Sequence, residues 1–134
     1  MRTYFKYVAL TGAILGATTA GALEEVPAVP SGQAISLQEV LLDVKPDGVL
    51  TYARFRFVTP EIGTERSYGD VETDFAFLCA EYALPIVEAG PDKVDQIVIS
   101  FASQPVEFGV SDPDTTQFFE AFRVENGSCI WEEF

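Results

Sequence analysis

Arginine and tyrosine side chains alternate in one segment of the chain, in an arrangement that could bind an anion. Residues 49–58 predict a β-strand, in which Tyr52, Arg54 and Arg56 share one face because successive side chains alternate. Guanidinium groups bind carboxylates and phosphates through paired hydrogen bonds. The alternative is that these side chains pair with acidic neighbours on a solvated strand face. Tyr52, Arg54 and Arg56 are therefore the candidate ligand-binding residues.

Acidic side chains near two turns suggest a second kind of chemistry. Asp112 and Asp114 flank a proline, and Asp92 and Asp95 follow Gly90-Pro91, so each pair offers oxygen ligands to Ca²⁺. The spacing lacks the glycine and the distal glutamate of a calcium loop, whereas an Asp cap followed by Pro explains the first pair. We therefore predict no metal site and no cofactor.

The absence of histidine, together with the acidic composition, excludes several classes of function. The chain has 134 residues, no His, and 21 acidic against 8 basic side chains, a formal net charge of −13. Histidine is the commonest general base, and the sequence also lacks a phosphate-binding glycine loop, a nucleophile elbow and a C-x-x-C pair. Nucleic acid needs a basic protein face. The sequence therefore predicts no catalytic residues and no nucleic-acid binding, with a hydrolase that uses two carboxylates as an alternative.

The N-terminus has the pattern of a secretory signal peptide. Arg2 and Lys6 precede an apolar stretch, and Ala20 and Ala22 occupy the −3 and −1 positions of a cleavage site. A retained membrane anchor is the alternative, but the apolar run is shorter than the roughly 20 residues that a spanning helix needs. Residues 1–22 are thus the expected signal peptide. Cleavage would leave six basic and 21 acidic residues, a net charge of −15, and no membrane span.

Two cysteines in an exported chain suggest a disulfide between Cys79 and Cys129. Closing a loop of about 50 residues is worth roughly 4 kcal/mol in the chain-entropy model. A reactive thiol is the alternative, but no basic side chain lies near either cysteine in the sequence to lower its pKa.

Residues 23–34 contain two prolines and a Ser-Gly pair without periodicity, which predicts a linker or an extended lead-in. Residues 35–134 then form a single globular domain. Alternating or β-branched segments bounded by turns predict about six strands, at residues 35–44, 49–58, 96–102, 106–110, 118–125 and 128–134.

Residues 70–84 predict the main helix, with Asp70 as its N-cap and Pro85 ending or kinking it. The opposite side of this helix carries Phe77 and Leu84, which could be buried by a loop or form a contact surface. On the side that faces the core, apolar residues recur every three or four positions and form a stripe. These residues are Val71, Phe75, Leu78 and Tyr82, with Cys79 on the same stripe.

The dipeptide Asn126-Gly127 predicts a two-residue hairpin turn. Such a turn fixes the register, pairing Glu125 with Ser128, Val124 with Cys129 and Phe122 with Trp131. Cys129 then points to the same side as the apolar residues of the hairpin, while Cys79 lies on the apolar stripe of the helix. The predicted fold is therefore α+β, a mostly antiparallel sheet of about six strands with one main helix on one face, stapled by the disulfide.

Three segments resemble a known family: LQEVLLD (37–43), RFRFVTPEI (54–62) and the C-terminal thirty residues from PVEFGVSDPD to the end (105–134). The family comprises small exported alphaproteobacterial proteins that carry a domain of unknown function. The resemblance implies a Gram-negative origin and a periplasmic or extracellular location, and it implies no activity. We therefore expect a non-enzymatic accessory or protein-interaction module with a periplasmic protein partner, for which Phe77 and Leu84 could supply the surface. The alternatives are a small-anion binding protein and a carboxylate-dependent hydrolase.

Overall fold

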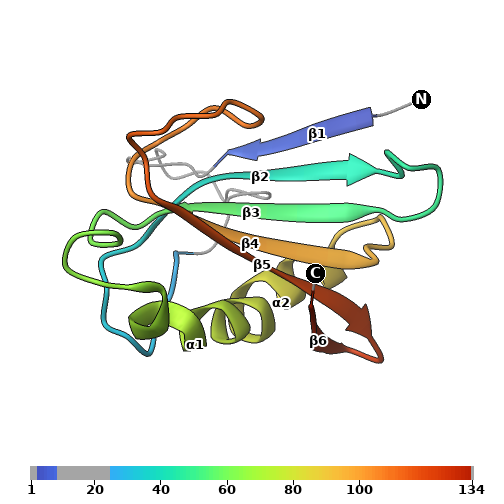
Figure 1. Ribbon diagram of the computed structural model, residues 1–134. Helices are drawn as coiled ribbons and strands as arrows, with labels where there is room; N and C mark the ends of the chain where they lie inside the picture. Colours follow the sequence, from blue (N-terminus) through green and yellow to red (C-terminus); the bar gives the residue numbers. More distant parts are fainter. Residues whose placement is uncertain (1–2, 9–24, 134) are drawn as a thin grey trace, which may run out of the picture.

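A twisted sheet carries a helical segment across one of its faces (Figure 1). The computed structural model describes residues 3–8 and 25–133. The strands follow one another across the sheet in the order of the sequence. They are β1 (Thr3–Val8), β2 (Ser36–Val44), β3 (Tyr52–Val58), β4 (Gln96–Ala102), β5 (Gln117–Glu125) and β6 (Ser128–Glu132).

The sheet is mixed rather than wholly antiparallel. Strands β3 and β4 run parallel, with Phe55 opposite Ile99, while the other neighbouring strands are antiparallel. Parallel neighbours need a crossover connection, and here the helical segment between β3 and β4 supplies it. The expectation of a mostly antiparallel sheet is therefore correct except for the pair that the helix connects.

Residues 25–133 contribute five strands instead of the six that the sequence predicted. The expected strand at residues 106–110 is wrong, because this segment belongs to a loop between β4 and β5. The carbonyl of Val106 accepts hydrogen bonds from Gln38 Nε2 at 2.9 Å and from Arg56 Nη2 at 2.7 Å. Side chains of β2 and β3 thus hold this loop in place. Within the described residues, residues 106–110 do not pair with any strand. The additional strand β1 comes from the predicted signal peptide.

The helical segment begins earlier and ends later than predicted. It comprises α1 (Tyr68–Leu78), a π-helical turn η1 (Cys79–Ala83) and α2 (Leu84–Ala89). The N-cap is Ser67 rather than Asp70, which instead completes a capping box at the third helical position.

Pro85 does not end the helix, because the π turn precedes it. A proline ring normally clashes with the carbonyl four residues earlier and cannot donate a hydrogen bond to it. In this chain the backbone N–H of Leu84 reaches Cys79 O, five residues back, and this wider turn accommodates Pro85. The segment therefore continues to Ala89 without a break.

The core lies between the helical segment and the near face of the sheet. The predicted helix stripe is confirmed, since all five of its residues are buried. Phe75 stacks on Phe101 with ring centroids 4.1 Å apart, and Tyr82 contacts the rings of Phe55 and Phe57 at about 6 Å. Aromatic pairs of this kind contribute about 0.5–1.5 kcal/mol beyond the area that they bury.

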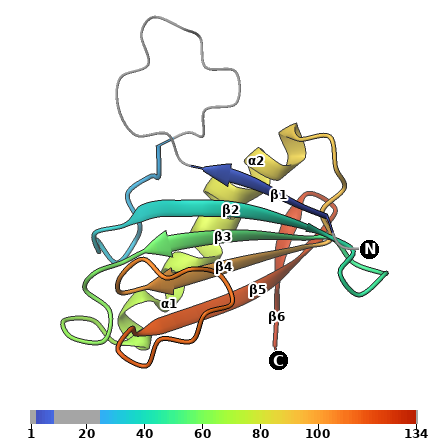
Figure 2. The same ribbon diagram turned by 90° about the horizontal axis from the view of Figure 1, so that it is seen from above.

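The predicted register of the C-terminal hairpin is confirmed. Figure 2 shows its two strands, β5 and β6, at the edge of the sheet. Asn126 and Gly127 both have positive φ, 51° and 72°, as the predicted two-residue turn requires. The disulfide Cys79–Cys129 is confirmed and joins η1 to β6, with Cα atoms 6.2 Å apart. Trp131 is more than half exposed, and β6 lies at the edge of the sheet.

Residues 25–34 lie against the domain as an extended lead-in. Val29 and Gln33 are buried. The carboxylate of Asp74, a fully buried residue of α1, accepts hydrogen bonds from Ser31 N at 2.9 Å, Ser31 Oγ at 2.5 Å and Gln33 Nε2 at 2.9 Å. Arg66 Nη1 donates to the carbonyl of Ser31 at 2.9 Å. This segment, which the sequence placed outside the globular domain, is thus fixed to it by side-chain hydrogen bonds.

Candidate functional site

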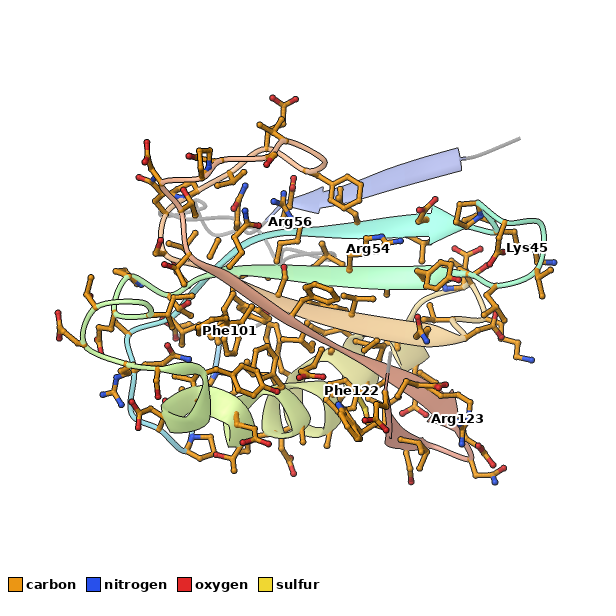
Figure 3. The ribbon with its side chains drawn as sticks, in the orientation of Figure 1. Lys45, Arg54, Arg56, Phe101, Phe122 and Arg123 are labelled. Carbon is orange, nitrogen blue, oxygen red and sulfur yellow. A yellow bond between two sulfur atoms is a disulfide. The ribbon has the colours of Figure 1, made fainter. Side chains whose placement is uncertain are left out.

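The face of β2 and β3 that points away from the helices carries the predicted anion-binding residues (Figure 3). Alternation along β3 buries Ala53, Phe55 and Phe57 against the helices and sends Arg54 and Arg56 to the opposite face. The loop of residues 103–116 folds back over this face beside β2, as Figures 1 and 3 show. The site therefore has strands as its floor and this loop as one wall.

Arg56 is held inside the protein. Its guanidinium forms an ion pair with Glu39 of β2 and donates to the carbonyl of Val106 in the loop. Both Arg56 and Glu39 are less than a tenth exposed. The sequence left two alternatives for Arg56, anion binding and pairing with an acidic neighbour. Its contacts match the second, an ion pair with a residue of the neighbouring strand.

Arg54 is less completely engaged. Its Nη2 lies 3.6 Å from Asp43 Oδ2, and Asp43 is fully buried. The Cζ of Arg54 lies 5.1 Å from the ring centroid of Tyr52 and 5.4 Å from that of Phe108, within the range of cation–π contacts. Its Nε atom is buried and has no hydrogen-bond partner among the described residues.

Tyr52 joins this cluster through its ring, whereas its hydroxyl points to the turn after β2. The hydroxyl donates to Asp47 Oδ2 at 2.9 Å, and this hydrogen bond is the main reason that the pKa of Tyr52 is raised. Asp47 also accepts from the backbone N–H groups of Val49 and Leu50, which lower its own pKa. The structure thus brings the three predicted residues to one face without directing all their polar atoms to one point.

An open groove of about 660 Å³ lies beside these arginines, between β2 and the loop. Leu41 and Val106 are its buried apolar residues, and Phe108 stands over Arg54 and Arg56 with 40% of its surface exposed. Val110, further along the loop, is half exposed. The residues that line the groove are Gln38, Glu39, Leu41, Pro105, Val106, Glu107 and Phe108.

The sequence pattern predicted a strand at residues 106–110, which form the loop side of this groove. Val106, Phe108 and Val110 alternate as they would in a strand, which explains the wrong assignment. Gly109, with a φ of 84°, and the prolines at positions 105 and 113 were the signals that could have identified a loop carrying exposed apolar side chains.

The two residues predicted as an interaction surface lie at the core or its margin. Leu84 is 5% exposed, and Phe77 is partly buried and packs against the core. Leu84 belongs to the buried hydrophobic core. A partner could therefore reach Phe77 but not Leu84 in this conformation.

Exposed apolar side chains occur elsewhere on the described surface. Phe119 of β5 and Ile130 of β6 lie on the sheet face opposite the helices. Trp131 lies on the face that carries the helices. Trp131 Nε1 donates to Glu120 Oε2 at 2.7 Å, and the hydroxyl of Tyr68 donates to the other carboxylate oxygen of Glu120. These contacts fasten β6 and the start of α1 to β5.

One aspartate in each acidic turn accepts hydrogen bonds within the protein. Asp112 accepts from Asp114 N at 3.0 Å and from Thr115 Oγ1 at 2.9 Å, so it caps its turn as the alternative reading predicted. Asp95 Oδ2 accepts from Thr51 N at 2.9 Å. Within residues 3–8 and 25–133, no three acidic or cysteine side chains are grouped as metal ligands would be.

Fold and site together define a small α+β domain with a mixed sheet, one covered face, a disulfide between helix and sheet, and a loop-walled groove on the other face. The chain belongs to a family of unknown function (DUF6497), whose profile matches residues 10–134. This confirms the resemblance to a family whose domain has no known function. No curated protein and no solved structure gave a significant match. In the part of the chain that the structure describes, no helix has the length and apolar character needed to cross a membrane.

Proposed function

We propose that the chain is exported, loses residues 1–22, and acts in the periplasm or outside the cell as a non-enzymatic domain that binds another polypeptide at the groove. Two features support export. The N-terminal residues have the pattern of a signal peptide, and the Cys79–Cys129 disulfide is stable in an oxidising compartment.

The single observation that carries polypeptide binding is the composition of the groove. Its walls combine buried apolar side chains, Leu41 and Val106, with the exposed ring of Phe108, while the guanidinium of Arg56 is already paired with Glu39. Apolar area flanked by polar groups is what a docking peptide or protein segment buries. A small anion would need free guanidinium donors instead, and Arg56 offers fewer of these than its sequence position suggested.

Variants of the exposed aromatic residue test this proposal. Phe108→Ser should abolish the binding of a partner captured from the periplasm with the wild-type domain, because it removes the exposed apolar surface of the groove. Val49→Ser is the matched control, since Val49 is 69% exposed but lies in the turn after β2. The partner is then purified and its affinity for all three proteins measured by calorimetry. Equal affinities for wild type and Phe108→Ser would refute binding at the groove.

A small anion bound at Arg54 is the second candidate function, and a specific observation favours it. The Nε atom of Arg54 is buried without a hydrogen-bond partner among the described residues, beside Tyr52 and Phe108. Titration with inorganic phosphate or acetate should then shift the NMR signal of this Nε–H and leave that of Arg123 unchanged. Arg54→Gln should remove the binding, whereas Arg123→Gln, which changes an exposed arginine on β5, should not. Parallel, linear shifts of both arginines would indicate general ionic strength effects and would rule this site out.

A further inference from the structure

We propose that removal of the signal peptide opens the edge of β2, and that the partner of this domain fills that edge with an extended strand that carries a basic residue opposite Leu41. The inference rests on the proposed function and specifies how the partner binds. It starts from the position of β1, which belongs to the predicted signal peptide but lies in the sheet.

Strand β1 occupies the edge of the sheet alongside β2, as both ribbon views show (Figures 1 and 2). Six consecutive residues pair antiparallel with β2, from Thr3 opposite Val44 to Val8 opposite Glu39. All six lie within residues 1–22, so cleavage after Ala22 removes the whole strand. β2 then becomes the edge strand of the sheet.

An edge at β2 offers a strong template for strand addition. β2 is nine residues long, and its outer side would present a row of unpaired N–H and C=O groups. Its centre is buried when β1 is in place, including Val40, Leu41 and Leu42. Edge strands that remain free usually are short or carry proline, charged side chains or a bulge. The segment Ser36–Val44 is long and has no proline or lysine, although it carries Glu39, Asp43 and a register shift between Leu37 and Glu39. An added strand would restore the main-chain hydrogen bonds and cover the apolar side chains.

The charges along β2 specify the residue that suits the centre of the added strand. Glu39, Leu41 and Asp43 share the face opposite the helices, because side chains two residues apart point the same way. A residue opposite Leu41 on this face is therefore flanked by two carboxylates, which also pair with Arg56 and Arg54 of β3, and a lysine or arginine there places a further cation between the two acids. In the register of β1, this position is occupied by Lys6. The adjoining groove at Val106 and Phe108 can accept an apolar side chain of the same partner.

A second copy of the chain fits this edge poorly. If two β2 strands paired antiparallel around Leu41, Glu39 of one copy would lie opposite Asp43 of the other, and like charges directly opposite one another are destabilising. The net charge of −15 that remains after loss of residues 1–22, from six basic and 21 acidic residues, adds general repulsion between copies. The occupant is therefore a segment of a different polypeptide.

The probe that tests strand addition is a peptide with the sequence of residues 2–9, RTYFKYVA, blocked at both ends. The full chain is expressed with export, and the processed protein is purified from the periplasm and its N-terminus sequenced. The peptide should bind saturably. Hydrogen exchange should slow at least tenfold for the amides of Glu39–Val44 that face away from β3 and remain unchanged for those of β6, the opposite edge of the sheet.

Two peptide variants distinguish recognition of the charge from nonspecific binding, and the protein stays unchanged. The Lys6→Glu peptide should bind at least tenfold more weakly, while the Lys6→Arg peptide should bind as well as the parent. Absence of saturable binding, protection of β6 in place of β2, or equal binding of the Lys6→Glu peptide would each overturn the inference. So would a dimer in sedimentation analysis that excludes the peptide. A purified protein that retains residues 1–22 would refute processing as well, whereas failure of the peptide alone would leave the proposed groove function standing.

Discussion

Buried polar side chains of this protein are held by partners distant in the sequence. Asp74 shows this most clearly, since it lies fully buried on α1 and accepts three hydrogen bonds from Ser31 and Gln33, more than 40 residues earlier. A buried carboxylate is tolerated only when hydrogen bonds replace the water that it loses. Asp74 therefore fixes the lead-in segment to the domain.

Asp74→Asn should lower the free energy of unfolding by about 2 kcal/mol, because an amide places donors where Ser31 and Gln33 also donate. Chemical denaturation measures the loss, and hydrogen exchange at the Ser31 amide should accelerate. Glu72→Gln is the control, since Glu72 is exposed on the same helix. If both variants are equally stable, Asp74 does not anchor the lead-in.

Tyr68 provides a pH-dependent test at the same scale. The pKa of Tyr68 is raised from 10.0 to about 12, mainly by burial of its side chain and secondly by its hydrogen bond to Glu120. The folded state therefore keeps this proton when the unfolded state has lost it, so stability falls as the pH rises from 10 to 12. Tyr68→Phe should make this decline shallower in denaturation curves recorded across that range. An ultraviolet titration should lose one late-ionising tyrosine in the variant, and identical titrations for both proteins would contradict the assignment.

At the scale of elements, the helical segment combines a strong start with an irregular middle. Ser67 and Asp70 form the capping box, in which Ser67 N donates to Asp70 Oδ2 at 2.8 Å. The π turn η1 carries both Cys79, which is bonded to β6, and Tyr82, which contacts Phe55 and Phe57 of β3. The irregular turn is thus joined to the sheet both by a covalent bond and by aromatic contacts.

Ser67→Ala should destabilise the protein by about 1 kcal/mol, because it leaves an amide at the helix N-terminus without its side-chain acceptor. Ser111→Ala, in the exposed loop between β4 and β5, is the matched control and should change stability by less than about 0.5 kcal/mol. Thermal denaturation followed by circular dichroism compares the two. A larger effect at Ser111 than at Ser67 would show that the cap contributes little.

At the scale of the whole molecule, the disulfide connects the helical layer to the last strand. It closes a loop of 50 residues that includes the parallel strand β4 and the groove loop. In the unfolded chain such a constraint removes conformations, which favours the folded state. The bond therefore stabilises an arrangement whose contacts are mostly long-range.

The double variant Cys79→Ala/Cys129→Ala should lose roughly 4 kcal/mol of unfolding free energy if chain entropy dominates. Denaturation of oxidised wild type, reduced wild type and the double variant separates the bond from the packing of the sulfur atoms. Mass spectrometry of the oxidised protein should show one linked peptide pair. Equal stability of oxidised and reduced protein would refute a structural role for the bond.

The sequence by itself determined the features that depend on neighbouring residues or on pattern. Asn126-Gly127 set the register of the last hairpin because few residues adopt two consecutive positive φ angles. The spacing of Val71, Phe75 and Leu78 identified the buried side of the helix. Two cysteines in a chain predicted to be exported suggested the disulfide, and the positions of Cys79 on that side and of Cys129 on the inner side of the hairpin agreed with it.

Only the tertiary structure decided which distant segments meet. The parallel pairing of β3 with β4, the loop that folds over the arginine face and the placement of β1 on β2 all join residues far apart in sequence. Alternation shows which side chains share a face, but it does not show what covers that face. For this reason the sequence placed Arg54 and Arg56 on one strand face, but it did not identify Asp43 and Glu39 as their partners or the adjoining groove.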